Sequence, residues 1–175
     1  VTTTYDEKKL TGVLDDMSCF QQENIVAPED AYLEEQDGEY VIVPEVEGNT
    51  PDRTKVESAV KDAIENGKTE INLEELGCYE KPSVLQDDAG LIAERDAKNQ
   101  LLKVDITYDF GDRSETVDGS VVKDWLIQDS DGNWTVDESK AAAYVQQLAY
   151  KYDTFGLTHE FTTHAGNKIT LKGGD

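Results

Sequence analysis

The spacing of hydrophobic residues along the chain predicts several amphipathic helices. Between Asp52 and Asn66 apolar side chains recur every three or four positions, and Gly67 follows the last of them. An aspartate at the start and a glycine after the end make this the pattern of a capped helix that buries one face. Helices of the same kind are expected over residues 5–17, 88–102 and 137–152, and a shorter one over residues 119–127.

Other stretches show the alternation of apolar and polar residues that is typical of half-buried strands. In KVDITYDF, residues 103–110, every second side chain from Val104 onwards is apolar, so these side chains share one face. Pro44 interrupts a β-branched stretch and indicates an edge or a break there. Strands are expected at residues 39–47, 70–73, 103–110 and 134–136, and a terminal hairpin at residues 159–175.

A repeat connects two of the helices. EGNTPDRTKVESAVKDAI, residues 47–64, aligns with DGNWTVDESKAAAYVQQLA, residues 131–149, when one inserted residue is allowed. Each copy has an acid, Gly-Asn, a capping aspartate and an amphipathic helix, and Gly-x-Thr follows each helix. We therefore expect an α+β fold with two related turn–helix–strand units and small mixed or antiparallel sheets. The expected module is elongated and two-lobed, with domains at residues 1–88 and 89–175.

The repeat also explains a stretch that resembles a calcium loop, DSDGNWTVDESK at residues 129–140. The EF-hand pattern requires glycine at its sixth position and glutamate at its twelfth, where this chain has Trp134 and Lys140. The first copy of the repeat keeps Gly-Asn but lacks the alternating aspartates. A turn that leads into a helix is therefore what recurs, and we predict no metal site.

The charge of the chain restricts its partners. Its 175 residues include 38 acidic and 16 basic ones, which gives a formal net charge of −22. Such a field repels phosphates, so we expect no nucleic-acid partner and no direct binding to anionic membranes. No apolar run reaches the length of about 20 residues that crosses a bilayer.

The sequence offers no convincing catalytic residues and no cofactor motif. HEFTTH, residues 159–164, has one residue more than the zinc-protease motif HExxH, so its histidines would not share a helix face. No glycine-rich phosphate loop and no nucleophile elbow are present. Neither Cys19 nor Cys78 has a convincing nucleophile context, because a thiol nucleophile requires a base and an oxyanion hole that the sequence does not show. The two cysteines could form one disulfide or remain two buried thiols, and the sequence alone leaves both alternatives open.

Aromatic residues are the candidate ligand contacts, because their rings stack on the apolar faces of sugars. Most of them lie on periodic apolar faces, where core packing is the simpler interpretation. Trp134 is the best exception because it lies beside a turn. The candidate ligand-binding residues are Trp134, Tyr108 and Phe155.

Several stretches together resemble one known family. They are APEDAY at residues 27–32, YVIVPEVEGNT at 40–50, CYEKP at 78–82, ITYDFGDRSETVDG at 106–119, YDTFG at 152–156 and the terminal GGD. They are similar to the peptidoglycan-binding domain that precedes the catalytic domain of L,D-transpeptidases in Gram-positive bacteria, especially clostridial ones. The resemblance covers essentially the whole chain as a series of short matches.

The resemblance implies an extracellular accessory segment of a wall cross-linking enzyme. The parent would carry an N-terminal membrane helix and a C-terminal transpeptidase domain, both outside this sequence. The Ser-His-Gly-Cys motif of that catalytic domain is absent here, so no catalytic residue is carried over. An extracellular setting also favours a Cys19–Cys78 disulfide. The alternative function is a spacer that positions the catalytic domain and binds no wall polymer tightly, because a chain of −22 gains nothing from anionic glycan carboxylates.

Overall fold

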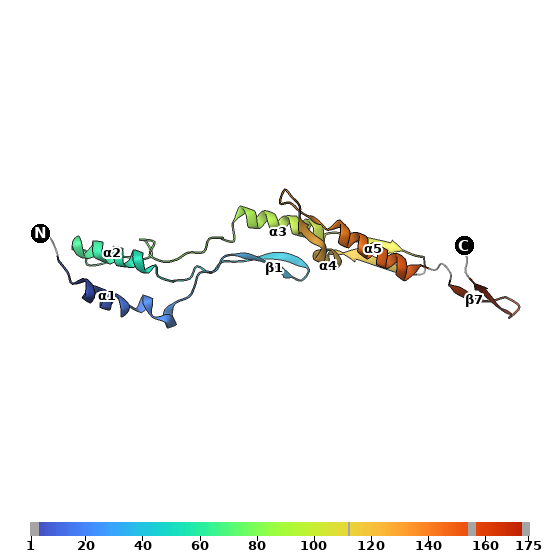
Figure 1. Cartoon of the computed structure of the whole chain (residues 1–175), viewed down its shortest axis with the longest axis horizontal. Coiled ribbons are helices and arrows are strands. Elements are labelled where there is room, and N and C mark those ends of the chain that lie inside the picture. Colours follow the sequence, from blue (N-terminus) through green and yellow to red (C-terminus); the bar gives the residue numbers. More distant parts are fainter. Residues whose placement is uncertain (1–3, 112, 154–156, 173–175) are drawn as a thin grey trace. The chain divides into compact units, whose positions relative to one another are not determined.

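The computed structural model describes residues 4–111, 113–153 and 157–172. The chain divides into two compact units, unit 1 (Val1–Asp96) and unit 2 (Ala97–Asp175). The described residues form five α-helices and four two-stranded antiparallel sheets, which can be followed in Figure 1. The predicted α+β class is therefore confirmed.

Unit 1 is organised around two helices, α1 (Glu7–Asp15) and α2 (Arg53–Glu65). Asp6 caps α1, and Asp52 caps α2 by accepting a hydrogen bond from the N–H of Lys55. The fully buried side chains of the cluster that joins them are Leu14, Val56 and Cys78. Both helices match the predicted positions, because capping and apolar spacing are local signals. Between them come two 3₁₀ turns, Ser18–Phe20 and Gln22–Asn24.

A hairpin of β1 (Tyr32–Gln36) and β2 (Glu39–Val43) follows in unit 1. The strand predicted over residues 39–47 is confirmed for its first part and ends before Pro44, although Val46 forms an isolated bridge with Glu29. The strand predicted at residues 70–73 is wrong. There the Asn72 side chain accepts hydrogen bonds from the N–H groups of Glu74 and Glu75, which begins a turn instead of a strand.

In both copies of the repeat, the Gly-Asn turn leads into a capped helix. In the first copy Gly48 has φ +66°, and a Cβ there would lie 2.5 Å from the backbone nitrogen of Pro28, so only glycine fits. The backbone N–H of each capping aspartate also has an equivalent role. Asp52 donates to the Cys78 carbonyl and Asp137 donates to the Trp125 carbonyl, each at 2.8 Å. The repeat therefore specifies the turn and the capping residue at which each helix begins.

Helix α3 (Ala89–Leu102) leads into unit 2. Unit 2 contains a hairpin of β3 (Asp105–Asp109) and β4 (Ser114–Asp118), a short helix α4 (Gly119–Val122), a 3₁₀ turn Lys123–Trp125, and a hairpin of β5 (Leu126–Gln128) and β6 (Trp134–Val136). The helix predicted over residues 119–127 therefore ends early, because Leu126 and Ile127 are taken into β5. The long helix α5 (Glu138–Tyr152) and the terminal hairpin of β7 (Thr158–Thr162) and β8 (Lys168–Lys172) agree with the prediction.

Candidate functional site

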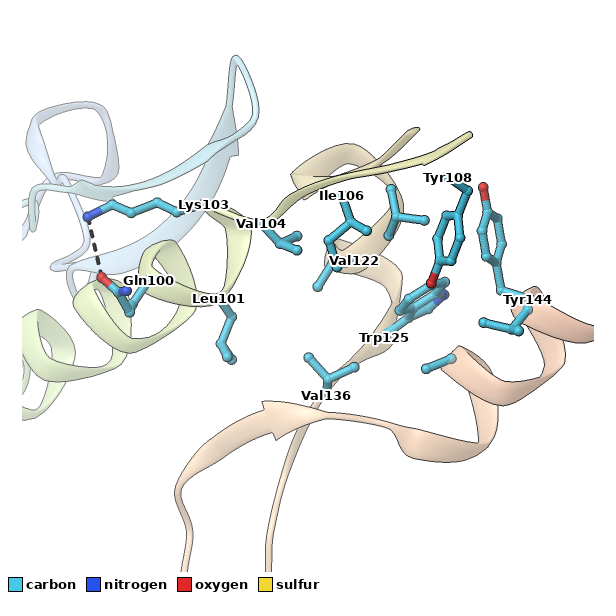
Figure 2. Close-up of a pocket in the computed structure, with 13 residues that line it drawn as sticks. Gln100, Leu101, Lys103, Val104, Ile106, Tyr108, Val122, Trp125, Val136 and Tyr144 are labelled. Carbon is cyan, nitrogen blue, oxygen red and sulfur yellow. Dashed lines mark hydrogen bonds between the residues drawn. The ribbon is translucent and has the colours of Figure 1, made fainter. Parts of the chain in front are cut away.

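Unit 2 contains an apolar cavity of about 560 Å³. This volume falls in the range of small-molecule sites, roughly 300–1,000 Å³. Its lining residues come from the end of α3, from β3 and β4, from α4 and the 3₁₀ turn after it, from β6 and from α5, and Figure 2 shows most of them. Its lining residues are Gln100, Leu101, Lys103, Val104, Ile106, Tyr108, Val117, Val122, Trp125, Val136, Ala141, Tyr144 and Val145.

The sequence pattern explains why these side chains meet. Val104, Ile106 and Tyr108 alternate along an extended segment, so they point to one face. Ala141 and Tyr144 lie three residues apart on α5 and share one helix face. A Cβ on Gly119 would lie 2.5 Å from the Leu102 carbonyl oxygen, so the absence of a side chain lets α4 start against the end of α3. These local features bring α4 and α5 to the same face of β3.

One end of the cavity is aromatic. The rings of Trp125 and Tyr144 lie 5.3 Å apart between centroids and are tilted by 60°, a favourable arrangement for an aromatic pair. Tyr108 lies beside them (Figure 2). All three side chains are half-buried. Their two hydroxyl groups and the indole N–H have no hydrogen-bond partner within the described part of the chain. This end can therefore both stack on a ligand and hydrogen-bond to it.

Lys103 belongs to the lining, but its side chain points away from the other labelled side chains and toward Gln100 (Figure 2). Lys103 Nζ donates to Oε1 of Gln100 at 3.4 Å, and it forms no ion pair with any residue that the structure describes. Unit 2, to which Lys103 belongs, is far less acidic than unit 1. Residues 97–175 contain 13 acidic and 8 basic residues (net −5), whereas residues 1–96 contain 25 and 8 (net −17). A ligand with one negative charge is therefore repelled less by unit 2 than by unit 1.

A clamp at the end of α5 fixes this helix beside the β3–β4 hairpin. The carboxylate of Glu115 accepts hydrogen bonds from Lys151 Nζ and the Tyr152 hydroxyl. The Tyr152 ring also stacks on Phe110, with centroids 4.2 Å apart and planes 24° apart. The hydrogen bonds from Lys151 and Tyr152 lower the pKa of Glu115, and the hydrogen bond with Glu115 raises the pKa of Lys151. Because Glu115 faces Tyr108 in the strand register, the clamp holds α5 next to the aromatic end of the cavity.

The three aromatic residues predicted as ligand contacts do not form one cluster. Tyr108 lines the cavity. Trp134 is half-buried on β6, outside the lining, and Lys98 Nζ lies over its ring at 4.0 Å from the centroid. One face of the Trp134 ring is therefore covered by a cation. Phe155 lies outside the described residues.

The sequence analysis did not single out Lys103 or Tyr144 as site residues. Tyr144 shows the ordinary spacing of a core-facing helix position, and this spacing does not distinguish a cavity wall from a filled core. Lys103 is one of 16 basic residues, and its sequence neighbours do not reveal that no described acidic residue pairs with it. The one sequence feature that could have pointed to this site is the alternation of apolar residues along β3, which begins directly after Lys103.

Unit 1 contains a second, smaller groove of about 360 Å³. Its floor is apolar and includes Val60, Ala63 and Ile64 from α2, and Lys68, Thr69 and Glu70 form a polar edge. Lys68 is paired with Asp62 at 3.1 Å. The groove can therefore contact a ligand through apolar groups and through its polar edge.

The two cysteines are free thiols in the structure. Cys78 is buried in the core of unit 1, with 1% of its surface exposed, and this burial raises the pKa of its thiol. Cys19 is half-buried. The structure therefore lacks the disulfide that the resemblance implied, and the pairing stays a prediction.

The loop that resembles a calcium site uses its first aspartate to form a turn. The Asp129 carboxylate accepts hydrogen bonds from the N–H groups of Asp131 and Asn133, and these lower its pKa. Within the described ranges, no group of three histidine, cysteine, aspartate or glutamate side chains could hold a metal ion. Residues 158–162 form a strand, so the HEFTTH stretch does not form the helix on which HExxH depends.

Comparison with known proteins gives one match. Residues 1–72 match a family described as "Putative peptidoglycan binding domain". The match lies within unit 1, where it includes the groove residues up to Ile71 and excludes the cavity of unit 2. No curated protein and no solved structure matches the chain. In the described part of the chain, no helix is both long and apolar enough to span a membrane.

Proposed function

We propose that this protein is a non-catalytic module that binds peptidoglycan at the bacterial cell wall. The observation that carries the proposal is the match of residues 1–72 to a peptidoglycan-binding family. The groove of unit 1 supports it, since it offers an apolar floor and a polar edge within the matched segment. We assign the first wall contact to this groove, and further aromatic contacts to Tyr108 and Trp134 of unit 2.

A spacer that binds no wall polymer tightly is the second candidate. The charge of unit 1, −17, favours it, because a strongly acidic surface repels the carboxylates of an anionic polymer. A binder with this charge must use apolar contacts, hydrogen bonds or the amines of the wall peptides. Co-sedimentation with purified peptidoglycan separates the two candidates: a binder moves into the pellet, and a spacer stays in the supernatant.

At a finer level, we propose that the module works outside the cell beside a C-terminal L,D-transpeptidase domain of the same polypeptide, tethered by an N-terminal membrane helix. The support is the resemblance of the stretches quoted above. Transfer through an acyl-enzyme requires an activated nucleophile, a base and donors for the oxyanion. Cys78 is buried with a raised pKa, which opposes a role as a thiolate nucleophile.

The non-catalytic proposal is tested by incubating the chain with a tetrapeptide-stem substrate of peptidoglycan. We expect neither a cross-linked nor a hydrolysed product by mass spectrometry. Turnover that disappears in Cys19→Ala or Cys78→Ala would contradict this part of the proposal and identify the chain as an enzyme.

A further inference from the structure

One stretch of unit 1 has the side-chain pattern of a strand but no strand partner. Over residues 70–73 exposed and half-buried side chains alternate, and the two half-buried ones, Ile71 and Leu73, line the groove of unit 1. Such alternation is typical of a chain that buries one face of a strand. The stretch follows the end of α2 and stops at the turn that the Asn72 side chain begins. The pattern of a strand is therefore present here, and the pairing is missing.

The backbone of this stretch has unused hydrogen-bonding groups on one edge. Alternate residues of a strand point their N–H and carbonyl groups to the same edge. On the edge of Glu70, the N–H of Lys68 is already bonded to the Ala63 carbonyl at 2.8 Å. On the other edge, neither the N–H nor the carbonyl group of Thr69 or Ile71 has a hydrogen-bond partner among the described residues. Such groups are the template on which a peptide strand adds.

The walls of the groove oppose a sugar ring as the ligand. Apart from the stretch itself, they consist of aliphatic groups and one thioether, and they contain no aromatic ring. These wall residues are Met17, Val60, Ala63, Ile64 and Leu73. Rings that could stack on a sugar are therefore missing, and each sugar hydroxyl that loses water here without gaining a partner costs free energy. The small apolar side chains of a peptide would instead gain from leaving water.

The charge beside the groove favours a ligand with a cation. Glu70 belongs to the lining, is exposed, and forms no ion pair with any residue that the structure describes. Lys68, also in the lining, is already paired with Asp62 at 3.1 Å. Unit 1 carries a net charge of −17, and such a field attracts amines and repels carboxylates. An amine of the ligand can therefore pair with Glu70.

We propose that this groove binds an extended peptide, which adds as a strand to Thr69 and Ile71 and pairs an amine with Glu70. The wall peptide of peptidoglycan is the source to which this assignment commits, because it combines a peptide backbone, small side chains and amines. The stretch also lies at the end of the segment that matches the peptidoglycan-binding family, residues 1–72. The inference rests on the proposed function and makes it more specific: unit 1 recognises the peptide of the polymer and not the glycan.

The test is a peptide titration of the ¹⁵N-labelled full chain, followed by NMR. Both tryptophans belong to unit 2 and do not report on the groove. The probe is a tetrapeptide of three alanines and one lysine with both termini blocked, and its control has norleucine in place of lysine. We expect saturable shifts of the amide signals of residues 69–71 and about fivefold tighter binding of the lysine peptide, as for a partly exposed ion pair.

Hydrogen exchange in the bound state tests the backbone pairing. The amides of Thr69 and Ile71 should exchange more slowly when the peptide is bound, because strand addition gives their N–H groups a partner. The amide of Glu70 points to the other edge and should exchange as it does without peptide. This neighbour is an internal control, since a ligand that only covers the groove would slow all three amides together.

A matched pair of substitutions tests the ion pair. Glu70→Gln should make the lysine and norleucine peptides bind equally. Glu75→Gln changes an exposed acid outside the lining by the same single group and should keep the difference. Both positions are exposed, and thermal unfolding verifies that both variants fold. The tetramer of N-acetylglucosamine should leave the amide signals of residues 69–71 unchanged.

Four results would overturn the inference. They are the absence of saturable shifts up to about 10 mM peptide, which corresponds to very weak binding, unchanged exchange at Thr69 and Ile71, a lysine preference that survives Glu70→Gln, and a response of the same amides to the sugar. Sedimentation with whole peptidoglycan is measured in parallel. A chain that sediments but does not bind the peptide keeps the proposed function and loses this inference. A chain that binds the peptide but does not sediment keeps the site and loses the wall-binding function.

Discussion

Replacing Leu14 by alanine should destabilise unit 1 and leave unit 2 intact. Leu14 is 1% exposed and packs with Val56 and Cys78, the two other buried residues of its cluster. Removing three carbon groups costs about 2.4 kcal/mol at about 0.8 kcal/mol each, and the remaining cavity raises the loss to about 3 kcal/mol. For a unit of 96 residues this corresponds to a fall in Tm of about 15 °C.

The positions of the two tryptophans make the effect measurable for each unit separately. Trp125 and Trp134 both belong to unit 2, so tryptophan fluorescence reports the unfolding of unit 2, while far-UV circular dichroism reports both units. We expect Leu14→Ala to lower the Tm of the unfolding transition that circular dichroism reports. The Tm of the transition that tryptophan fluorescence reports should stay unchanged. Val13→Ala, at a neighbouring position that is 63% exposed, should change stability by less than about 0.5 kcal/mol. Equal losses in both variants, or an equal shift of the fluorescence transition, would refute the reasoning.

Two further predictions concern the clamp and the cysteines. Because its partners lower the folded-state pKa of Glu115, its contribution to stability is complete above the ordinary glutamate pKa of about 4.3 and is lost as pH falls through the lower folded value. Thermal unfolding followed by fluorescence should therefore lose less stability between about pH 5 and 3 in Glu115→Gln than in the parent or in Glu160→Gln, and equal losses in all three would contradict the clamp. The Cys19–Cys78 disulfide should lower the mass of the non-reduced protein by about two units, since its formation removes two hydrogens; two alkylatable thiols in unfolded, non-reduced protein would disprove it.

The sequence predicts the helices of this protein better than its strands. Asp52 and Asp137 cap helices because their side chains accept hydrogen bonds from backbone N–H groups two or three residues further along the chain. A pattern that spans so few residues can be recognised in the sequence. The strand prediction at residues 70–73 is wrong because the Asn72 side chain accepts hydrogen bonds from two backbone N–H groups. Such a side chain competes with strand pairing for the backbone donors, and apolar spacing does not reveal this competition. The early end of the helix at Val122 depends on the pairing of Leu126 with Val136, which is also invisible in local spacing.

The candidate site was predictable only in part. Tyr108 was found because it alternates with Val104 and Ile106 and is aromatic, and it lines the cavity. The coverage of Trp134 by Lys98 joins residues 36 positions apart in sequence. Whether a described acidic residue pairs with Lys103 depends on the positions of all the acidic residues around it. Both are properties of the folded chain. They explain why a list of exposed-looking aromatic residues did not identify the cavity.

The measurement that tests the central claim most directly is a binding isotherm of the full chain on purified peptidoglycan, with chitin and cellulose as control polymers. Bound and free protein are separated by centrifugation over a range of polymer concentrations. The account predicts saturable binding to peptidoglycan and no retention on cellulose. It also predicts little retention on chitin, because chitin has the N-acetylated sugar without the peptide. Protein that stays in the supernatant at every peptidoglycan concentration would contradict wall binding and leave the spacer role.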